Sequence, residues 1–553
     1  MAKKSKQRAR EEQPSSPEVP EVPEVPEVSE VPEAKQPEPD RRQRWIRGLS
    51  LSALSGVLYF VGYVGFGQSY LTWLCFLPAL VALEGESPKR AFWFGTMLGT
   101  VMSIGGFYWV TQLLTQFANL PWPVGVLGLL LLAFQQGVGI GLVTWAVRRL
   151  GRDLELSPAV SLPLALTAQE LLYPQLFPFY IGASQYRFTM LTQIVEFTGV
   201  VGIATLIGLV NGALYELIAA RRQRRAIVRR RLVPALLSVV LALSFGAMRL
   251  DQVGAAMAAA KKIDVALIQT NLGAKDKHEK AAEFIERHRS MTLEAIAQHP
   301  ELDLVVWPES AYNAWVPRDV KNLSEPVTHG ITTPLLFGAL TWDRSAAGDP
   351  RGYNSAVLTS SSGAVLGTFD KVVLLMFGET LPLVSTFPSL AKYYPQSSSF
   401  TAGTRLKHLR LRDGTALLPM ICYEDLIPSF VRDMWHSDGP AEALVNITND
   451  SWYGDSHEPL EHLTLATFRS IETRRALIRA TNTGISAVVD PTGKLTARTG
   501  QWTQETLLAE VPLMTTPTET FYLRWGDLYG WIIAIALGIL LVRAEIVRRA
   551  SAR

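Results

Sequence analysis

The chain of 553 residues has only two cysteines, Cys75 and Cys422, so no disulfide framework is possible. Its formal net charge is only +3 and its soluble part has no basic stripe, which argues against nucleic-acid binding. A glycine-rich phosphate loop and a Gly-x-Ser-x-Gly elbow are both missing. His457 and His462 are five positions apart with Pro459 between them, which is not the spacing of a zinc helix. We therefore expect no metal and no cofactor.

Apolar residues, by contrast, are abundant at 48% of the chain, and they form runs long enough to cross a membrane. We predict eight spans, seven of them within residues 45–250 and the last within 526–543. They lie at about 46–64, 70–83, 91–115, 122–147, 158–181, 190–220, 232–249 and 528–542. Cys75 falls in the second run and is interpreted as packing. The chain is thus predicted to be an integral membrane protein.

Basic residues gather at the ends of these spans, and in an eight-span path every cluster falls on the same side. The clusters lie at 41–47, 89–90, 148–152, 221–231 and 543–553. The positive-inside rule places this side in the cytoplasm, together with both termini and the basic end at 544–553. The stretch at 262–515, between the last two spans, is then predicted to be an extracytoplasmic domain.

Residues 1–44 differ from the rest of the chain, because a Pro-Glu-Val repeat runs from Pro17 to Val28. Proline at every third position prevents helix and sheet hydrogen bonding, and the glutamates keep the segment solvated. We predict a disordered cytoplasmic tail, either passive or used for docking. It is not a signal peptide, since it has no apolar core followed by a cleavage site.

Among the few charged residues inside predicted spans, the carboxylates Glu170 and Glu196 stand out. An ionisable group at membrane depth indicates function by default. The alternative is structural, with each residue near a span end or bonded to a neighbouring helix. The sequence leaves both possibilities open.

The stretch at 262–515 consists mainly of short apolar segments. Strands are predicted at 263–269, 302–307, 335–340, 356–358, 365–369, 416–421, 443–447, 485–489 and 507–511. Helices are predicted at 279–298 and 458–472. Many strands and few helices indicate sheets whose outer faces are covered by helices.

A chemically distinctive residue follows three of these strands, namely Glu309, Lys371 and Cys422. Cysteine attacks as a thiolate, so it needs a base and a cation nearby. A carboxylate to take the thiol proton, an ammonium to hold an oxyanion and a thiolate to attack are together suited to acyl transfer through a thioester. Each alone has a simpler explanation, Cys422 as a small buried hydrophobe and the other two as solvated charges.

The residues around these positions form longer patterns. They are Trp-Pro-Glu-Ser at 307–310, Lys371 with Phe-Gly-Glu at 377–379, and Ile-Cys-Tyr-Glu at 421–424. Asn-Asp-Ser-Trp-Tyr-Gly-Asp at 449–455 and Arg-Ala-Thr-Asn-Thr-Gly-Ile-Ser at 479–486 belong with them. Together these patterns resemble the nitrilase superfamily and, within it, its membrane-embedded branch, the apolipoprotein N-acyltransferase family.

This resemblance implies an α-β-β-α sandwich on a polytopic helical bundle in the bacterial cytoplasmic membrane. It implies a monomeric enzyme that moves an acyl chain from a phospholipid, expected to be phosphatidylethanolamine, onto the α-amine of the diacylglyceryl-cysteine of apolipoproteins. In this family pattern Glu309 is the general base, Lys371 stabilises the tetrahedral intermediates and Cys422 forms the thioester.

The resemblance also implies four supporting residues, Asn354, Glu379, Tyr423 and Glu424. A second carboxylate near Lys371 would hold its ammonium in place. For Glu379 and Glu424 the alternative is a buried ion pair without chemistry.

Two positions depart from the family pattern. Met376 stands where a proline is usual, and His278 stands where a tryptophan is expected. The segment at 380–400 is rich in Leu, Phe and Tyr and contains several prolines. We interpret it as an apolar loop that lies on the bilayer and gates lipid entry, with a loop packed in the core as the alternative.

Two other functions fit parts of the sequence. A membrane-tethered nitrilase-like amidase or hydrolase would pass the thioester to water, but a single anchor would suffice for it. A non-catalytic scaffold or transporter would not need intact Glu309, Lys371 and Cys422. Acyl transfer is therefore the favoured prediction.

Overall fold

The computed structural model describes residues 40–117, 120–223, 229–273, 281–325, 327–375, 379 and 400–551. The predicted tail up to residue 39, Met376, His278 and the expected gating loop up to residue 399 lie outside the described residues. The chain separates into two units, Met1–Arg44 and Trp45–Arg553.

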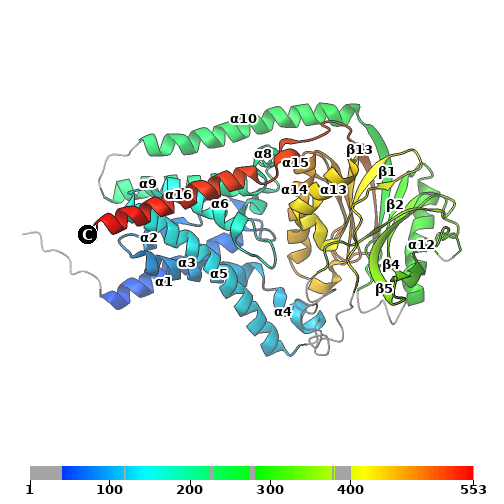
Figure 1. Cartoon of the computed structure of the whole chain (residues 1–553), viewed down its shortest axis with the longest axis horizontal. Coiled ribbons are helices and arrows are strands. Elements are labelled where there is room, and N and C mark those ends of the chain that lie inside the picture. Colours follow the sequence, from blue (N-terminus) through cyan, green and yellow to red (C-terminus); the bar gives the residue numbers. More distant parts are fainter. Residues whose placement is uncertain are drawn as a thin grey trace, which may run out of the picture. The chain divides into compact units, whose positions relative to one another are not determined.

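Long apolar helices form one part of the second unit (Figure 1). They are α1 (Arg41–Gly62), α3 (Pro88–Gly106), α5 (Trp122–Asp153), α6 (Pro158–Leu172), α9 (Val201–Arg222), α10 (Arg229–Ala259) and α16 (Leu528–Ser551). Among the described residues, five helices are long and apolar enough to cross a membrane. A sixth candidate arises if α3 is counted with the segment Val110–Gln116, from which it is bent by 64°.

Other predicted spans correspond to shorter or interrupted helices. The short helices are α2 (Leu77–Ala82), α7 (Thr189–Thr192) and α8 (Val195–Thr198). Gly199, at φ 63°, separates α8 from α9, so the span expected at 190–220 is not one helix. Within the span predicted at 158–181, helix α6 ends at Leu172, because Pro174 cannot continue it.

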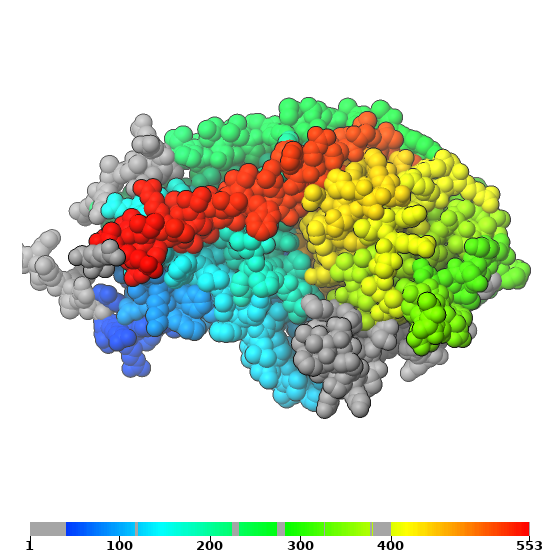
Figure 2. Space-filling view, viewed as in Figure 1, coloured from blue at the N-terminus to red at the C-terminus, as the bar shows by residue number. Residues whose placement is uncertain are grey.

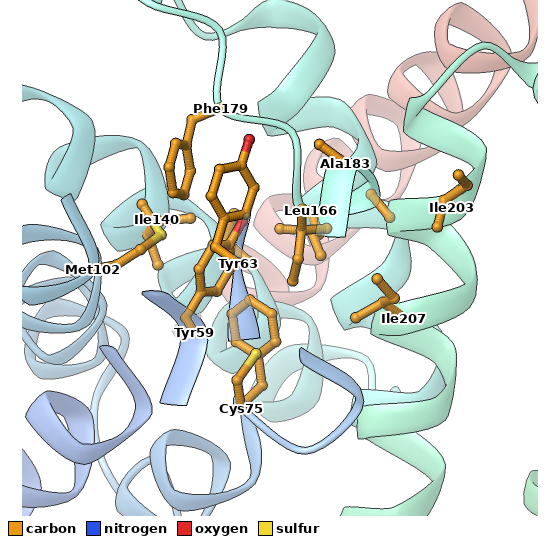
Figure 3. Packing of buried hydrophobic residues seen from close by; sticks show 14 of the residues in the cluster. Tyr59, Tyr63, Cys75, Met102, Ile140, Leu166, Phe179, Ala183, Ile203 and Ile207 are labelled. Carbon is orange, nitrogen blue, oxygen red and sulfur yellow. The ribbon is translucent and has the colours of Figure 1, made fainter. Parts of the chain in front are cut away.

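The helices pack around a core of aromatic and aliphatic residues (Figure 3). Tyr63 stacks on Phe179 with ring centroids 3.9 Å apart. Cys75 is buried in this core, as expected of a packing residue. A β-carbon at Gly99 would lie 2.8 Å from the Gly137 Cα, so glycine allows α3 and α5 to approach closely.

Helix α16 lies on the outside of this helical part, where it crosses α5 and α6 (Figure 2). Its Ile532, Ile535 and Ile539 are exposed. A row of exposed isoleucines fits a surface that faces lipid.

Two sheets form the other part of this unit. The first has the strand order β13 (Glu505–Leu513), β1 (Lys261–Gln269), β2 (Leu304–Val306), β4 (Leu335–Arg344), β5 (Pro350–Thr359) and β6 (Val365–Asp370), and β3 (Tyr312–Pro317) pairs with β4. The second has the order β12 (Leu495–Arg498), β11 (Ala487–Val489), β10 (Ala476–Thr481), β9 (Ala443–Thr448), β8 (Ala416–Ile421) and β7 (Leu409–Arg410).

Helices cover the outer faces of both sheets (Figure 1). They are α12 (Ala281–Gln298) on the first sheet and α13 (Pro428–Asp438) and α14 (Glu458–Thr473) on the second. The inner faces share one core, in which Val306 and Leu358 of the first sheet join Leu418 and Val445 of the second. The predicted α-β-β-α sandwich is confirmed, as is the helix expected at 458–472.

The two predicted intramembrane carboxylates have structural partners. Glu196 Oε2 lies 2.6 Å from Nη2 of Arg474, which follows α14, and Glu196 Oε1 lies 2.7 Å from Nη2 of Arg249 on α10. Glu170 Oε1 accepts a hydrogen bond from the Ile181 N–H at 2.7 Å. Glu196 therefore links the helical part to the sandwich, in agreement with the structural alternative.

Candidate active site

The three chemically distinctive residues follow strands whose ends meet. Glu309 comes after β2, Lys371 after β6 and Cys422 after β8. Strand β2 is parallel to β4, and β5 is antiparallel to both β4 and β6, so the carboxyl ends of β2 and β6 lie at the same edge of the first sheet. The second sheet brings Cys422 to this edge. The structure thus gathers the three positions on which the sequence-based prediction depends.

Lys371 lies between two carboxylates and is almost fully buried. Its Nζ is 2.8 Å from Glu379 Oε2 and 3.4 Å from Glu309 Oε1. Asn354, on β5, donates through Nδ2 to Glu309 Oε1 at 2.6 Å and to Glu379 Oε1 at 2.8 Å. Burial by itself lowers the pKa of Lys371, but Glu379 and Glu309 hold this pKa well above its usual value. Lys371 is therefore a fixed ammonium.

Cys422 begins a short turn with an unusual backbone. Its φ of 52° lies in the left-handed region, which residues other than glycine seldom adopt. Asn446 Nδ2 donates to the Cys422 carbonyl oxygen at 3.1 Å and braces this turn. Burial raises the pKa of the thiol and Glu309 raises it further, whereas Lys371 and the Thr448 hydroxyl lower it. The net result is a thiol that is protonated at rest and only 4% exposed.

Glu424 ties the cysteine turn to the segment that follows Lys371. Its Oε1 accepts hydrogen bonds from the backbone N–H groups of Val372 and Val373, at 2.7 and 3.0 Å. Its Oε2 accepts from the N–H of Ile421 at 2.8 Å. Burial raises the pKa of Glu424 to about 7, although these N–H groups oppose the rise. One buried carboxyl thus joins strand ends from the two sheets.

Tyr423 reaches toward the helical part rather than toward this cluster. Its hydroxyl donates to the Leu176 carbonyl oxygen at 3.3 Å, and its ring packs against both the helical core and the sandwich core. Of the four predicted supporting residues, Asn354 and Glu379 contact Glu309 or Lys371, while Glu424 and Tyr423 contact neighbouring backbone.

A buried charged network adjoins the cysteine turn and goes beyond the predicted site. Arg479 Nη1 donates to Asp425 Oδ2 at 2.6 Å and to Asn446 Oδ1 at 2.9 Å. Its Nη2 donates to Asp450 Oδ2 at 3.1 Å. Asn446 in turn holds the Cys422 carbonyl, so the network supports the turn that carries the thiol. Asp450 and Arg479 fall within the sequence patterns at 449–455 and 479–486, and these patterns are the sequence signal that could have identified the network.

His462 completes this network from α14. Its Nε2 lies 2.8 Å from Asp425 Oδ1 and its Nδ1 lies 3.1 Å from Asp450 Oδ1. Burial and Arg479 lower the pKa of His462, but the two aspartates outweigh them and raise it to about 10. Asp450, Glu458 and His462 are close enough together to hold a metal ion. Both ring nitrogens of His462 are already engaged by carboxylates, however, so this group is not an open ligand set.

Known proteins match both parts of the chain. Residues 55–213 match the apolipoprotein N-acyltransferase N-terminal domain, and residues 264–518 match the carbon-nitrogen hydrolase family. An apolipoprotein N-acyltransferase of Geobacter metallireducens is 32% identical over 91% of this chain and 96% of the relative. One of Brucella melitensis is 30% identical over 88% of this chain and 91% of the relative.

The sandwich is also similar to a solved structure from Saccharomyces cerevisiae, a member of branch 10 of the nitrilase superfamily, with 20% identity and a TM-score of 0.35 over 48% of this chain and 95% of that chain. The sequence relatives extend much further, across the helical part and the sandwich alike. On the strength of that identity and coverage, the chain belongs to the apolipoprotein N-acyltransferase family.

Proposed function

We propose that this enzyme transfers an acyl chain from a phospholipid, through a thioester on Cys422, to the α-amine of the N-terminal diacylglyceryl-cysteine of apolipoproteins. Family membership supports the reaction. The observation that carries the assignment of roles is the meeting of Glu309, Lys371 and Cys422 at one edge of the sandwich. Phosphatidylethanolamine is the proposed donor, and the enzyme acts as a monomer.

In the first half-reaction Glu309 accepts the thiol proton while Cys422 Sγ attacks the carbonyl carbon of the phospholipid ester. A C–S bond forms, and the carbonyl oxygen becomes an oxyanion that the Lys371 ammonium stabilises. The C–O bond to glycerol then breaks, and the leaving oxygen takes the proton from Glu309 to give a lysophospholipid. The raised pKa of the thiol supports this order, because a thiol that is protonated at rest needs a base as it attacks.

In the second half-reaction the α-amine of the acceptor attacks the thioester carbon. Glu309 accepts a proton from the amine, Lys371 again stabilises the oxyanion, and the C–S bond breaks to leave an amide. The proton then returns to Cys422. Attack by water would instead give the hydrolase alternative. The relatives that match most of this chain are named N-acyltransferases, and long apolar helices adjoin the sandwich; both favour a lipid donor and an amine acceptor.

The supporting residues act through position. Glu379 and Asn354 hold Lys371 and Glu309 at fixed distances from each other. Glu424 fixes the turn of Cys422 against the segment after Lys371. Such groups keep the reacting side chains within the narrow geometry that catalysis requires.

We also propose an arrangement in the bacterial inner membrane. The tail at 1–44 is cytoplasmic, 45–250 holds seven spans, 262–515 lies outside the cytoplasm, 526–543 is the eighth span and 544–553 is cytoplasmic. The basic clusters support this orientation. A reporter inserted within 262–515 should be active only outside the cytoplasm, and one fused to the carboxyl terminus only inside. A cytoplasmic signal from the first would contradict the arrangement.

The covalent mechanism is tested by mixing purified enzyme with labelled phospholipid, adding diacylated lipopeptide, and following the label in protein and peptide. Cys422→Ser should form no acyl-enzyme, and Glu309→Gln should slow acylation by about two to four powers of ten. Cys75→Ser is the matched control, because it changes the other buried cysteine, in the helical core. Triacylated peptide from Cys422→Ser at a near wild-type rate would refute the mechanism, and release of free fatty acid without peptide labelling would favour a hydrolase.

A further inference from the structure

A cavity of about 370 Å³ lies where the turn between β11 and β12 meets the helical part. It is lined by Tyr186, Arg187 and Thr189 from the helical part and by residues 493–498 from the sandwich. A volume of this size is sufficient for a small ligand group.

The lining is basic, although Asp490 of the same turn accepts a hydrogen bond from the backbone N–H of Lys494 at 3.2 Å. Arg187, Lys494 and Arg498 line the cavity, and none of the lining residues is a carboxylate. In the part of the chain that the structure describes, no salt bridge pairs any of these three side chains with Asp or Glu. Arg187 Nε donates to the Tyr186 hydroxyl at 2.9 Å, and its guanidinium lies over that ring, 5.4 Å from the centroid. These contacts orient Arg187, and no hydrogen bond among the described residues occupies its two terminal nitrogens.

The cavity lies at the level where the apolar surface of α10 ends. The backbone of Met190 lies against Gly246 of α10, with no room there for a side chain. Met248, two residues further along α10, is still apolar and exposed, and Arg249 follows it. Phe188, between the lining residues of the helical part, is 47% exposed. A change from exposed apolar residues to charged residues along a helix is typical of the place where a span leaves the bilayer.

This cavity is separate from the candidate active site. It is next to β12, which is four strands away from β8 in the order of the second sheet. At the usual spacing of about 4.8 Å between strands, that places β12 roughly 19 Å from the strand that carries Cys422. A ligand in the cavity therefore does not contact the reacting atoms.

We propose that the cavity binds the phosphate of an anionic phospholipid headgroup and that this lipid seats the sandwich on the bilayer surface. Three cations around one cavity repel one another unless an anion is bound between them. Arginine matches phosphate through paired N–H donors. A net-anionic headgroup such as phosphatidylglycerol is preferred, because the amine of a zwitterionic headgroup already neutralises its own phosphate. Basic pockets beside membrane helices are suited to such headgroups.

The test measures lipid retention by the full-length protein, so its outcome is independent of Cys422 chemistry. Purified enzyme in detergent is mixed with phosphatidylglycerol or phosphatidylcholine, and bound lipid is counted by native mass spectrometry. The variant Arg187→Gln/Lys494→Gln/Arg498→Gln should bind phosphatidylglycerol roughly tenfold to a hundredfold more weakly than wild type, since each cation contributes about a fivefold preference near a surface.

The matched control, Lys321→Gln/Lys407→Gln/Arg412→Gln, removes three exposed cations elsewhere on the sandwich and should bind lipid as wild type does. The proposal would be overturned if wild type and the cavity variant retained phosphatidylglycerol equally. It would also be overturned if wild type retained phosphatidylcholine as well as it retains phosphatidylglycerol. Inorganic phosphate, titrated calorimetrically at constant ionic strength, should not bind below millimolar concentration. Micromolar binding of free phosphate without lipid retention would assign the cavity to a soluble anion and would also overturn it.

Discussion

Replacing Glu424 by glutamine tests whether one buried carboxyl positions the nucleophile. The glutamine keeps an oxygen for Val372 and Val373 but turns an NH₂ donor toward the Ile421 N–H, which Glu424 Oε2 accepts at 2.8 Å. The loss of a hydrogen bond to a charged group costs about 1.5–3 kcal/mol, and a buried N–H without an acceptor costs about 1–3 kcal/mol. Glutamine carries no charge that must be buried, which offsets part of these two costs. We therefore expect the free energy of unfolding to fall by about 2–4 kcal/mol.

Catalysis should suffer more than stability. Ile421 directly precedes Cys422, and a displacement of about 1 Å at a reacting atom lowers rates by about a hundredfold. We expect acyl-enzyme formation to slow by about that factor. The assay follows acylation of folded Glu424→Gln by intact-protein mass spectrometry at pH 8, above the pKa of about 7 of Glu424. The KM for phospholipid should change little, because Glu424 is bonded to backbone N–H groups among the described residues and not to a group placed to hold substrate.

The chain offers a matched control in Glu442→Gln. Glu442 Oε2 accepts a hydrogen bond from the Ala416 N–H at 2.6 Å, at the opposite end of β8 from Cys422. This substitution should also reduce stability but should leave the acylation rate of folded protein near that of wild type. If Glu424→Gln slows acylation no more than Glu442→Gln does, then Glu424 contributes to stability and does not position Cys422.

Three further predictions concern other parts of the chain. Burial raises the pKa of Glu461 to about 8, so ionisation of this carboxyl lowers the stability of the fold as pH rises from about 4.5 through 8. The Tm of Glu461→Gln should therefore match that of wild type at about pH 5 and exceed it at about pH 9. Parallel Tm profiles for the two proteins would contradict this. Glu196→Gln leaves the fully buried Arg474 without its carboxylate and should lower the free energy of unfolding by about 3–5 kcal/mol. Glu519→Gln breaks an exposed pair and should lower it by less than about 1 kcal/mol, and denaturant unfolding measures both. Deleting residues 1–40 should change neither Tm nor acyl transfer, because the Pro-Glu-Val repeat adds nothing to a packed core; a large loss of either would indicate docking.

The candidate site is predictable from the sequence to the extent that its signals are local. An apolar run that ends in Glu309, Lys371 or Cys422 can be recognised without knowledge of the fold, and helical spacing suffices to find α14. The order of the strands and the contacts of Glu424 are not local, because they join segments from two sheets. The family resemblance predicts Glu424 as a supporting residue, but it does not predict which backbone groups Glu424 binds.

Buried charge explains the elements that sequence reasoning misses. Strand β10 is buried at all six positions, yet Arg479 interrupts its apolar run and suggests a surface loop. The guanidinium is tolerated there because Asp425 and Asp450, distant along the chain, lie against it. His462 is rejected as a zinc ligand on spacing alone, while its partner Asp425 is 37 residues away. Such pairs become visible only once the fold is known.

Helix limits in the bilayer are hard to predict for a different reason. Mean hydropathy reports which residues avoid water, and the side chains of a buried irregular segment are as apolar as those of a buried helix. The span predicted at 158–181 therefore includes residues 173–180, several of which are apolar but none of which is helical. Pro174 and Pro178 mark the end, but two prolines do not outweigh a long apolar run in such an average.

Helix α14 is buried at every position except Leu460. An outer helix of a free-standing sandwich would have one face in water, but Trp109 of the helical part donates to Glu461 at 3.2 Å and packs edge-on against Tyr453. The sandwich and the helical part therefore share one interior. If the chain were cut on both sides of residues 262–515, the released sandwich would expose the apolar surface that it buries against the helical part. This sandwich should therefore aggregate. Confinement of this catalyst to the membrane is thus a property of its folding, and a tether of any length could not replace it.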